Sequence, residues 1–371
     1  MPGLTQAPSQ PADIPDVTVD TRPGICALEP LTVDLALEWG ALADRHAADP
    51  FSRPEWVRAW GDTIGSEPVV VTIRRDRRLV AAYPMVVGSG TALRSAADWH
   101  VPHLDIVGDA DGMRLLVGGV LGRSRRVTFD FVTGATAQAV RRGLAAAGFL
   151  ARERVRQSSP WIDLTSGWEA YRESLSSRKW REIRRRRRRL EEDGAVTYSQ
   201  HDGRSNLDVL LTEGFVVEGS GWKEVSGTAV RSDSRVEAFY RRVAQWAVER
   251  GMLRLHFLRL DGRAIAFDLA FADGNAEWLL KTGFDPSLFA LSPGSLLRAE
   301  VLERAFGTGL TRYEFLGTAD AWKLEWTERT RDVVVIEGFA PGVRGRVADL
   351  GARLARRLSV IRSRGASRAA G

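Results

Sequence analysis

The residues best suited to chemistry in this sequence gather around two lysines, and the first is Lys223. It lies in a segment, residues 218–228, that holds three glycines. A cation on a glycine-rich loop is typical of an active site, where it can stabilise negative charge that develops during a reaction. Glu218 precedes it and is a candidate general base or an ion partner for Lys223. The alternative interpretation is a surface loop with a solvated lysine.

Each of the two lysines follows a tryptophan. Trp222 precedes Lys223 and Trp322 precedes Lys323, so each indole is placed to stack on a substrate. Lys323 lies beyond the last predicted strand and can reach the same cleft as Lys223. The alternative for Lys323 is an ordinary lysine at the edge of a sheet.

The segment from Asn275 to Phe315 must position these groups. Its pattern predicts a strand at 277–284, an irregular link at 285–291, a helix from Ser292 to Gly307 and a strand at 312–315. Apolar residues recur at helical spacing behind the helix start, which indicates that the helix packs on a sheet. We therefore expect the start of the helix to face one end of that sheet.

The start of this helix has the composition of an anion site. Ser292 is a good N-cap, Pro293 suits the first helical position, and Gly294 allows close approach of a ligand to the backbone. Unpaired N–H groups and the positive end of the helix dipole favour a phosphate or pyrophosphate there. The alternative is a well-capped core helix that binds nothing. The residues predicted to contact a cofactor are Ser292, Pro293, Gly294, Ser295, Leu296 and Leu297.

The rest of the chain divides into two units of strands and helices. Strands are predicted at 69–74, 79–87, 126–132 and 150–155 in the first unit, and at 195–201, 253–260 and 263–271 in the second, with helices between them. The hairpins at 69–87 and 253–271 share strand, turn and strand order with an aspartate at matching places, which favours duplication over chance similarity. We expect residues 1–24 to be disordered, 25–160 and 161–342 to form two lobes, and 343–371 to form a basic amphipathic helix and tail.

Composition excludes several classes of protein. The chain of 371 residues is 44% hydrophobic and 27% charged, as in a soluble globular protein with two or three domains. Its single cysteine, Cys26, cannot form an internal disulfide and fits a reducing compartment. We find neither a secretory signal nor an apolar stretch long enough to span a bilayer, so the expected location is the cytoplasm or the inner surface of the membrane.

Arginine is concentrated in two places. Arg184–Arg189 are six consecutive arginines, and more follow after Arg344, although the net charge is only +6. On a helix the run covers every face, so contact with a polyanion or a membrane surface is one interpretation. A solvated helix paired with Glu191, Glu192 and Asp193 is the other. His100 and His103 flank a loop with Asp98 and Asp105, but no further ligands follow at recognisable spacing, so no metal is predicted.

Four stretches carry a resemblance to a known family: residues 177–185, Glu218–Lys223, Ser292–Leu297 and Phe315–Trp326. Their order resembles the acetyl-CoA-binding half of the GNAT acyltransferase superfamily, and more narrowly its FemAB-like branch with the CelD-like acetyltransferases of cellulose biosynthesis. The resemblance implies an α/β (α+β) fold with two GNAT-like lobes, each a mixed central sheet flanked by helices. It also implies acetyl-CoA or another acyl-CoA as co-substrate.

The sequence departs from the wider superfamily at the pyrophosphate loop, where Leu291-Ser-Pro-Gly-Ser replaces a Gln/Arg-x-x-Gly-x-Gly/Ala motif. FemAB-type relatives move aminoacyl groups from tRNA to a cell-wall precursor, so that donor is the alternative. We predict a GNAT-type N- or O-acyltransferase that acts by direct attack on a sugar, glycan precursor or small metabolite. Glu218, Lys223 and Lys323 are the predicted catalytic residues, and Trp222 and Trp322 the substrate contacts. A basic RNA- or membrane-binding protein on a non-catalytic GNAT fold is the third hypothesis.

Overall fold

The computed structural model describes residues 24–88, 92–220 and 227–343, together with residues 345, 347 and 350. The tail predicted at 1–24 and the helix and tail predicted at 343–371 lie almost entirely outside the described residues.

The first lobe has the predicted succession of helices and strands, with additional short strands at 25–30, 93–95 and 107–108. Its elements are β1 (Ile25–Pro30), α1 (Val33–Arg45), η1 (Pro50–Ser52), α2 (Pro54–Thr63), β2 (Val69–Arg75), β3 (Arg78–Val87), β4 (Leu93–Ser95), β5 (Val107–Gly108), α3 (Ala110–Arg123), β6 (Arg126–Val132), α4 (Gly134–Ala146) and β7 (Leu150–Asp163).

The second lobe also follows the prediction up to residue 314, whereas the helix at 321–324 and the strand at 330–339 were not predicted. Its elements are α5 (Trp168–Ser174), α6 (Ser177–Asp193), β8 (Val196–His201), α7 (Leu207–Gly219), η3 (Val230–Ser232), α9 (Ser234–Glu249), β9 (Leu253–Leu260), β10 (Arg263–Asp273), β11 (Ala276–Phe284), η4 (Pro286–Leu291), α10 (Pro293–Phe306), β12 (Arg312–Glu314), α11 (Ala321–Leu324) and β13 (Thr330–Phe339). Glu218 and Gly219 end α7 instead of opening a loop, which corrects the predicted start of the glycine-rich segment.

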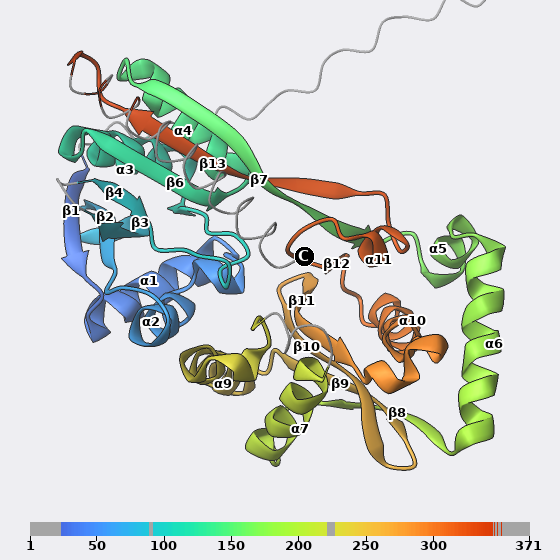
Figure 1. Cartoon of the computed structure of the whole chain (residues 1–371). Helices are drawn as coiled ribbons and strands as arrows, with labels where there is room; N and C mark the ends of the chain where they lie inside the picture. Colours follow the sequence, from blue (N-terminus) through green and yellow to red (C-terminus); the bar gives the residue numbers. More distant parts are fainter. Residues whose placement is uncertain are drawn as a thin grey trace, which may run out of the picture.

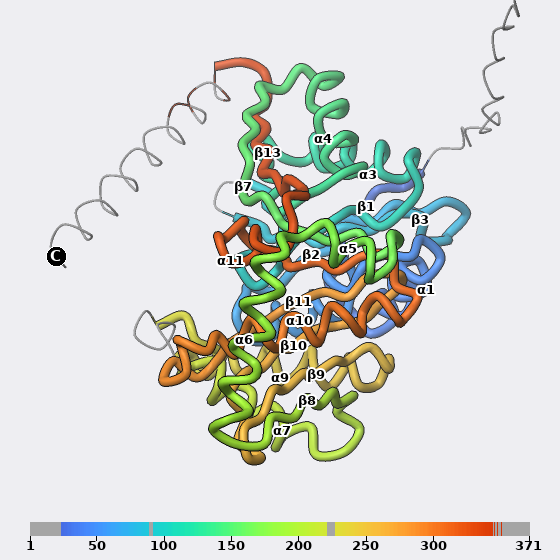
Figure 2. Tube along the Cα trace, turned by 90° about the vertical axis from the view of Figure 1, so that its right-hand side faces the viewer, coloured from blue at the N-terminus to red at the C-terminus, as the bar shows by residue number. Residues whose placement is uncertain are grey.

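Among the described residues, the strands of both lobes form one mixed sheet of 13 strands (Figure 1). Its order is β1-β2-β3-β4-β6-β13-β7-β12-β11-β10-β9-β8, and β5 pairs with β3 outside this path. In the second lobe, α7 and α9 pack on one face of the sheet and α10 on the other, while α6 runs along the outer side of α10 (Figures 1 and 2).

Two long strands, β7 and β13, join the lobes. The first part of β7 pairs antiparallel with β13, whereas its residues 161–163 pair with β12 of the second lobe. β13 comes last in the chain, yet it pairs with β6 of the first lobe. The strand predicted at 150–155 therefore runs on to Asp163, and the predicted boundary between residues 160 and 161 falls inside it.

Aromatic side chains close the junction between the lobes on the side away from α10. Trp56 of α2 is fully buried, and its ring meets Phe239 of α9 at 5.2 Å and Phe271 of β10 at 6.0 Å between centroids. Phe51 meets Trp278 of β11 at 5.4 Å. Such edge-to-face pairs stabilise the contact in addition to burying large apolar surface. Buried residues of both lobes belong to one cluster, so the two lobes share one hydrophobic core.

Candidate active site

The start of α10 forms the wall of a cavity, but it is not capped as the sequence predicted. Ser292 has a left-handed backbone (φ 47°, ψ 59°), and its hydroxyl makes no capping bond to the helix. Its carbonyl accepts the N–H groups of Ser295 at 2.9 Å and Leu296 at 3.2 Å. Its hydroxyl instead accepts a bond from Arg186 of α6 at 2.7 Å. The cap fails because an N-cap residue needs extended backbone, whereas Ser292 is left-handed and its hydroxyl bonds Arg186 outside the helix.

The cavity beside this helix start has a volume of about 430 Å³, and we call it the α10 cavity. It brings together predicted site residues from three separate parts of the sequence. Its lining residues are Glu218, Thr282, Gly283, Phe284, Pro286, Phe289, Gly294, Ser295, Arg298, Trp322 and Trp326. The long-range convergence of Glu218, Gly294, Ser295 and Trp322 is the strongest indication that this cavity is the functional site.

Glu218 reaches the cavity because α7 ends directly against β11. A Cβ atom on Gly283 would lie 2.4 Å from Cα of Glu218, so glycine is required for this approach. Glu218 is only 2% exposed, and its Oε2 accepts a hydrogen bond from the N–H of Val230 at 2.9 Å. The carboxylate is thus held in a fixed place at the cavity wall, as a positioned base or orienting group must be.

Trp322 and Lys323 have different surroundings. Trp322 lines the cavity, is 38% exposed and packs edge-on against Phe315. Lys323 is buried and donates from Nζ to the carbonyls of Leu316 at 2.9 Å and Thr318 at 2.8 Å. It does not line the α10 cavity, so its observed contacts are those of a residue that shapes the turn before α11, and its catalytic role stays a prediction.

The sequence analysis missed one residue of the cavity wall, Arg298. This arginine is 2% exposed, and its Nη2 lies 2.7 Å from a carboxylate oxygen of Asp268, which is 1% exposed. It also donates to the hydroxyl of Tyr313. The available signal was an arginine on the apolar face of the helix, four residues before Leu302, facing an aspartate within the apolar strand β10.

A second, basic groove of about 440 Å³ meets the α10 cavity at Ser295. Arg178, Lys179 and Arg186 of α6 line it together with two carboxylates, Glu182 and Glu325. Lys179 lies 3.8 Å from the centre of the Trp326 ring and 3.1 Å from Glu325. Burial lowers the pKa of the Lys179 ammonium, and the hydrogen bond to Glu325 partly opposes that shift. An apolar cavity, a helix start and a basic groove thus meet at one serine.

The arginine run on α6 is only partly paired. Arg185 and Arg186 bond Glu182, and Arg187 bonds Glu191 and Glu300. The bonds from Arg185 above all lower the pKa of Glu182 to about 2. In the described part of the chain, Arg184, Arg188 and Arg189 are exposed and make no ion pair. Of the predicted partners, Glu191 pairs with the run, whereas Glu192 and Asp193 make no ion pair among the described residues. The other partners, Glu182 and Glu300 of α10, were not predicted.

Two predicted site residues, Trp222 and Lys223, lie outside the described residues, and their roles stay predictions. Lys281, in the strand predicted at 277–284, is half-buried, with Nζ 4.7 Å from the centre of the Tyr240 ring. The pairing of β10 with β11 shifts beside it, since Leu269 and Ala270 face Lys281 and Leu279 and leave Leu280 as a bulge.

The described residues of the cavity and groove match a bipartite ligand. The apolar, partly aromatic cavity suits an acyl or other uncharged chain, and the helix start with its neighbouring cations suits phosphate groups. These features are those expected for a donor molecule in which an uncharged chain is joined to phosphate groups.

One family model matches part of the second lobe. Residues 177–324 match the family model of the acetyltransferase (GNAT) domain. This range contains α6, α7, the β9–β11 strands and α10, and therefore every described wall of the α10 cavity except Trp326. The second lobe is thus a GNAT domain of the acyltransferase class.

Solved structures share the whole two-lobed fold at low sequence identity. FemX is 13% identical, with a TM-score of 0.57 over 81% of this chain and 95% of its own. The C-terminal domain of a protein described as a lysylphosphatidylglycerol synthetase from Agrobacterium fabrum is 14% identical, with a TM-score of 0.54 over 86% and 96% of the two chains. L-PGS from Bacillus licheniformis is 12% identical, with a TM-score of 0.53 over 84% and 93%. The family model thus places a GNAT domain at residues 177–324, and the chain as a whole shares the two-lobed fold of these structures.

No curated protein sequence matches the chain. Within the described ranges, no helix combines the length and the apolar composition that a membrane span requires.

Proposed function

We propose that the protein transfers an acyl group, with acetyl as the leading candidate, from acyl-CoA to an amine or hydroxyl of a sugar, glycan precursor or small metabolite. The observation that carries this proposal is the convergence of Glu218, Ser295 and Trp322 on one cavity at the start of α10. In this arrangement the pyrophosphate of the donor lies at Gly294 and Ser295, and the basic groove along α6 receives its remaining phosphate.

The reaction proceeds by direct attack of the acceptor on the thioester. The acceptor nitrogen or oxygen forms a bond to the carbonyl carbon, the carbon–sulfur bond breaks, and the proton of the acceptor passes to a base while the thiolate of CoA leaves. Glu218 is the proposed base or orienting group, Lys223 the proposed stabiliser of the developing charge, and Trp322 a stacking contact.

A second candidate is aminoacyl transfer from tRNA. The likeness in fold to FemX and to lysylphosphatidylglycerol synthetases favours it, since the latter name denotes a lipid that carries an aminoacyl group. The exposed arginines of α6 would contact the nucleic acid. We also propose that the acceptor lies at the inner membrane surface or belongs to polysaccharide biosynthesis. A relationship to the CelD-like acetyltransferases is likewise a proposal.

Isothermal titration separates the two donors. At equal ionic strength, we expect heat of binding with acetyl-CoA and none with aminoacyl-tRNA. Binding of charged tRNA without binding of any CoA ester would replace the leading proposal by the second candidate. Binding of uncharged and charged RNA alike, without transfer to any acceptor, would favour the non-catalytic alternative.

A further inference from the structure

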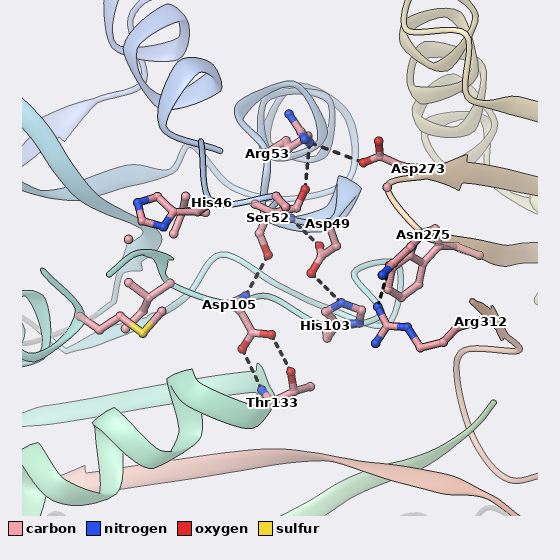
Figure 3. Close-up of a pocket in the computed structure, with 18 of the residues that line it drawn as sticks. His46, Asp49, Ser52, Arg53, His103, Asp105, Thr133, Asp273, Asn275 and Arg312 are labelled. Atoms are coloured by element: carbon pink, nitrogen blue, oxygen red, sulfur yellow. Dashed lines mark hydrogen bonds and ion pairs between the residues drawn. The ribbon is translucent and has the colours of Figure 1, made fainter. Parts of the chain in front are cut away.

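A second cavity lies at the junction of the lobes, apart from the α10 cavity (Figure 3). We call it the junction cavity, and its volume is about 570 Å³. It contacts β11 at Trp278, near the start of the strand, whereas the α10 cavity contacts β11 at residues 282–284. At about 3.3 Å per residue, these two places on β11 are roughly 15 Å apart.

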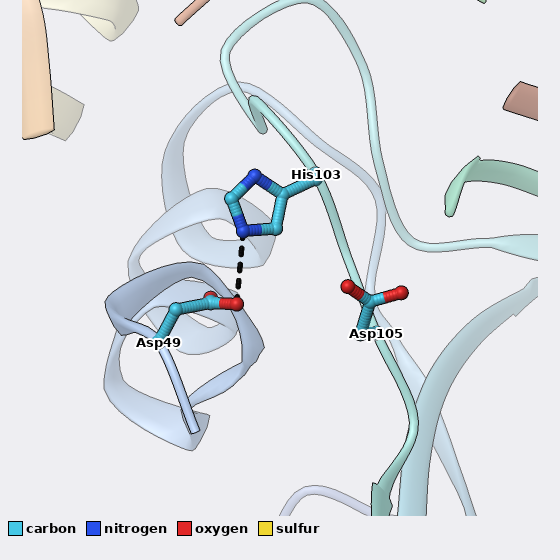
Figure 4. A group of neighbouring side chains, drawn as sticks. All are labelled: Asp49, His103 and Asp105. Atoms are coloured by element: carbon cyan, nitrogen blue, oxygen red, sulfur yellow. Dashed lines mark hydrogen bonds and ion pairs between the residues drawn. The ribbon is translucent and has the colours of Figure 1, made fainter. Parts of the chain in front are cut away.

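Three side chains in this cavity have the ligand atoms of a metal site (Figure 4). Asp49, His103 and Asp105 each place one such atom within 4.8 Å of the others. His103 Nε2 lies 2.9 Å from Oδ2 of Asp49, and His103 is 5% exposed. Two carboxylates and an imidazole are a ligand set that suits divalent zinc and manganese.

The two carboxylates are held from behind by the protein. Oδ1 of Asp49 accepts the N–H groups of Phe51 at 2.9 Å and Ser52 at 3.1 Å, which leaves Oδ2 directed at His103. Asp105 accepts from the N–H of Thr133 at 2.9 Å and from its hydroxyl at 2.6 Å. Such outer contacts orient ligands in metal sites and raise their affinity.

An independent observation on the other side of the cavity also indicates a ligand. Trp278 of β11 is 4% exposed, and its indole N–H has no acceptor among the described residues. Nε of Arg312 in β12 is buried and makes no hydrogen bond in the described part of the chain, and its carboxylate neighbour, Oε1 of Glu314, lies 3.9 Å away. Both residues line the junction cavity. Water or an anion bound to a cation at the three side chains would supply the missing acceptors.

We propose that Asp49, His103 and Asp105 bind one divalent cation, with its open coordination positions facing the junction cavity. The cation replaces the hydrogen bond between His103 and Asp49 and ties the loop that carries His103 to η1. The proposal is independent of the proposed acyl transfer, because none of the three residues lines the α10 cavity.

The test titrates the full-length, chelator-treated protein with ZnCl₂ and with MnCl₂ by calorimetry. We expect one equivalent to bind, and CoCl₂ to give the visible absorption of a protein-bound ion. Asp105→Asn should weaken binding by about 100-fold, and Asp49→Asn, which keeps the capping oxygen, should do the same. The matched control is His46→Gln, which removes another imidazole of the same cavity and should leave the affinity unchanged.

Three results would overturn the proposal. The first is a wild-type protein that binds neither ion at millimolar concentration. The second is unchanged affinity in both aspartate variants when circular dichroism shows them folded. The third is an equal loss of affinity in His46→Gln, which would mean that the cation binds elsewhere in the cavity. Binding of acetyl-CoA, measured in parallel, tests the transfer proposal separately.

Discussion

The two lobes repeat one arrangement of strands and helix and differ where the helix begins. In the first lobe the order is β2, β3, β4, the short β5, α3 and β6, and in the second it is β9, β10, β11, the short η4, α10 and β12. In each, the third strand pairs in parallel with the strand that follows the helix. The hairpin turns also match, with positive φ at Asp76 and Arg77 in one and at Asp261 and Gly262 in the other. The echo noted in the sequence therefore has a structural counterpart.

The start of α3 is closed, whereas that of α10 is open. Oδ1 of Asp109 accepts the N–H of Gly112 at 2.6 Å, and Asp111 adds a second carboxylate that pairs with Arg75. Ser292 makes no such bond, and Arg186 lies beside it. A carboxylate that already occupies a helix start repels an anionic ligand, which is why the proposed anion site lies in the second lobe.

The largest expected effect concerns the buried faces of the two helices. α3 buries only apolar residues and glycine, whereas α10 buries Arg298 against Asp268. Arg298→Met leaves an uncompensated buried carboxylate and should lower the free energy of unfolding by about 3–5 kcal/mol. Urea denaturation measures it. The double variant Arg298→Met with Asp268→Leu should recover most of the loss, and a single variant as stable as the wild type would contradict this account.

The next prediction concerns a variant with a carboxylate at the start of α10, like those at the start of α3. Ser295→Asp places a carboxylate beside the proposed phosphate site and should weaken acetyl-CoA binding by about 100-fold, equal to about 2.7 kcal/mol. Calorimetry measures the affinity. Ser295→Asn is the control of equal shape without charge and should change affinity much less. Equal affinities for the two variants would place the phosphates away from α10.

A smaller effect is expected when the carboxylate that caps α3 is removed. Asp109→Ala removes the cap of α3 and should cost about 1 kcal/mol of unfolding free energy, whereas Asp109→Asn should retain most of it. Neither variant should alter acetyl-CoA binding, because the proposed anion site lies at the start of α10 in the second lobe. Thermal denaturation and calorimetry on the same samples check both statements, and weaker donor binding in Asp109→Ala would refute the assignment.

The smallest effect concerns the contact between lobes at His100, whose Nδ1 lies 3.1 Å from the hydroxyl of Tyr240. Burial and then Lys281 lower the pKa of His100, while Asp98 and Asp233 oppose them. As pH falls below about 6.5, the unfolded chain takes up a proton that the folded His100 resists, so stability is lost in that range. His100→Asn should flatten this part of the stability profile. An unchanged slope between pH 7 and 5 would show that His100 titrates normally.

The sequence predicted local structure well because the patterns that determine it are local. The strand, link and helix around Pro293 and Gly294 lie where turn chemistry and apolar periodicity placed them. Glu218, Ser295 and Trp322 were identified from short motifs, and the structure brings them to one cavity. The order of the elements was sufficient to predict the class of fold.

Features that depend on distant contacts were missed. β1 and β13 were not predicted, although β13 contains the β-branched run Val333–Ile336, and both pair with strands far along the chain. Ser292 is turned from capping by Arg186, which is 106 positions away. His103 was weighed with its sequence neighbours, yet its partner is Asp49, 54 positions earlier. Spacing cannot reveal such pairs, since the fold alone brings them together.

The return of β13 to the first lobe has a consequence for how the chain is made. A ribosome releases the first lobe long before it synthesises residues 330–339, so β6 and the first half of β7 must wait with unpaired edges while the second lobe is translated. During that interval the exposed edges can pair with other chains. We expect ribosome-bound chains that end before residue 330 to be captured by chaperones and cut by proteases at β6 and β7, and release from both to coincide with the emergence of β13.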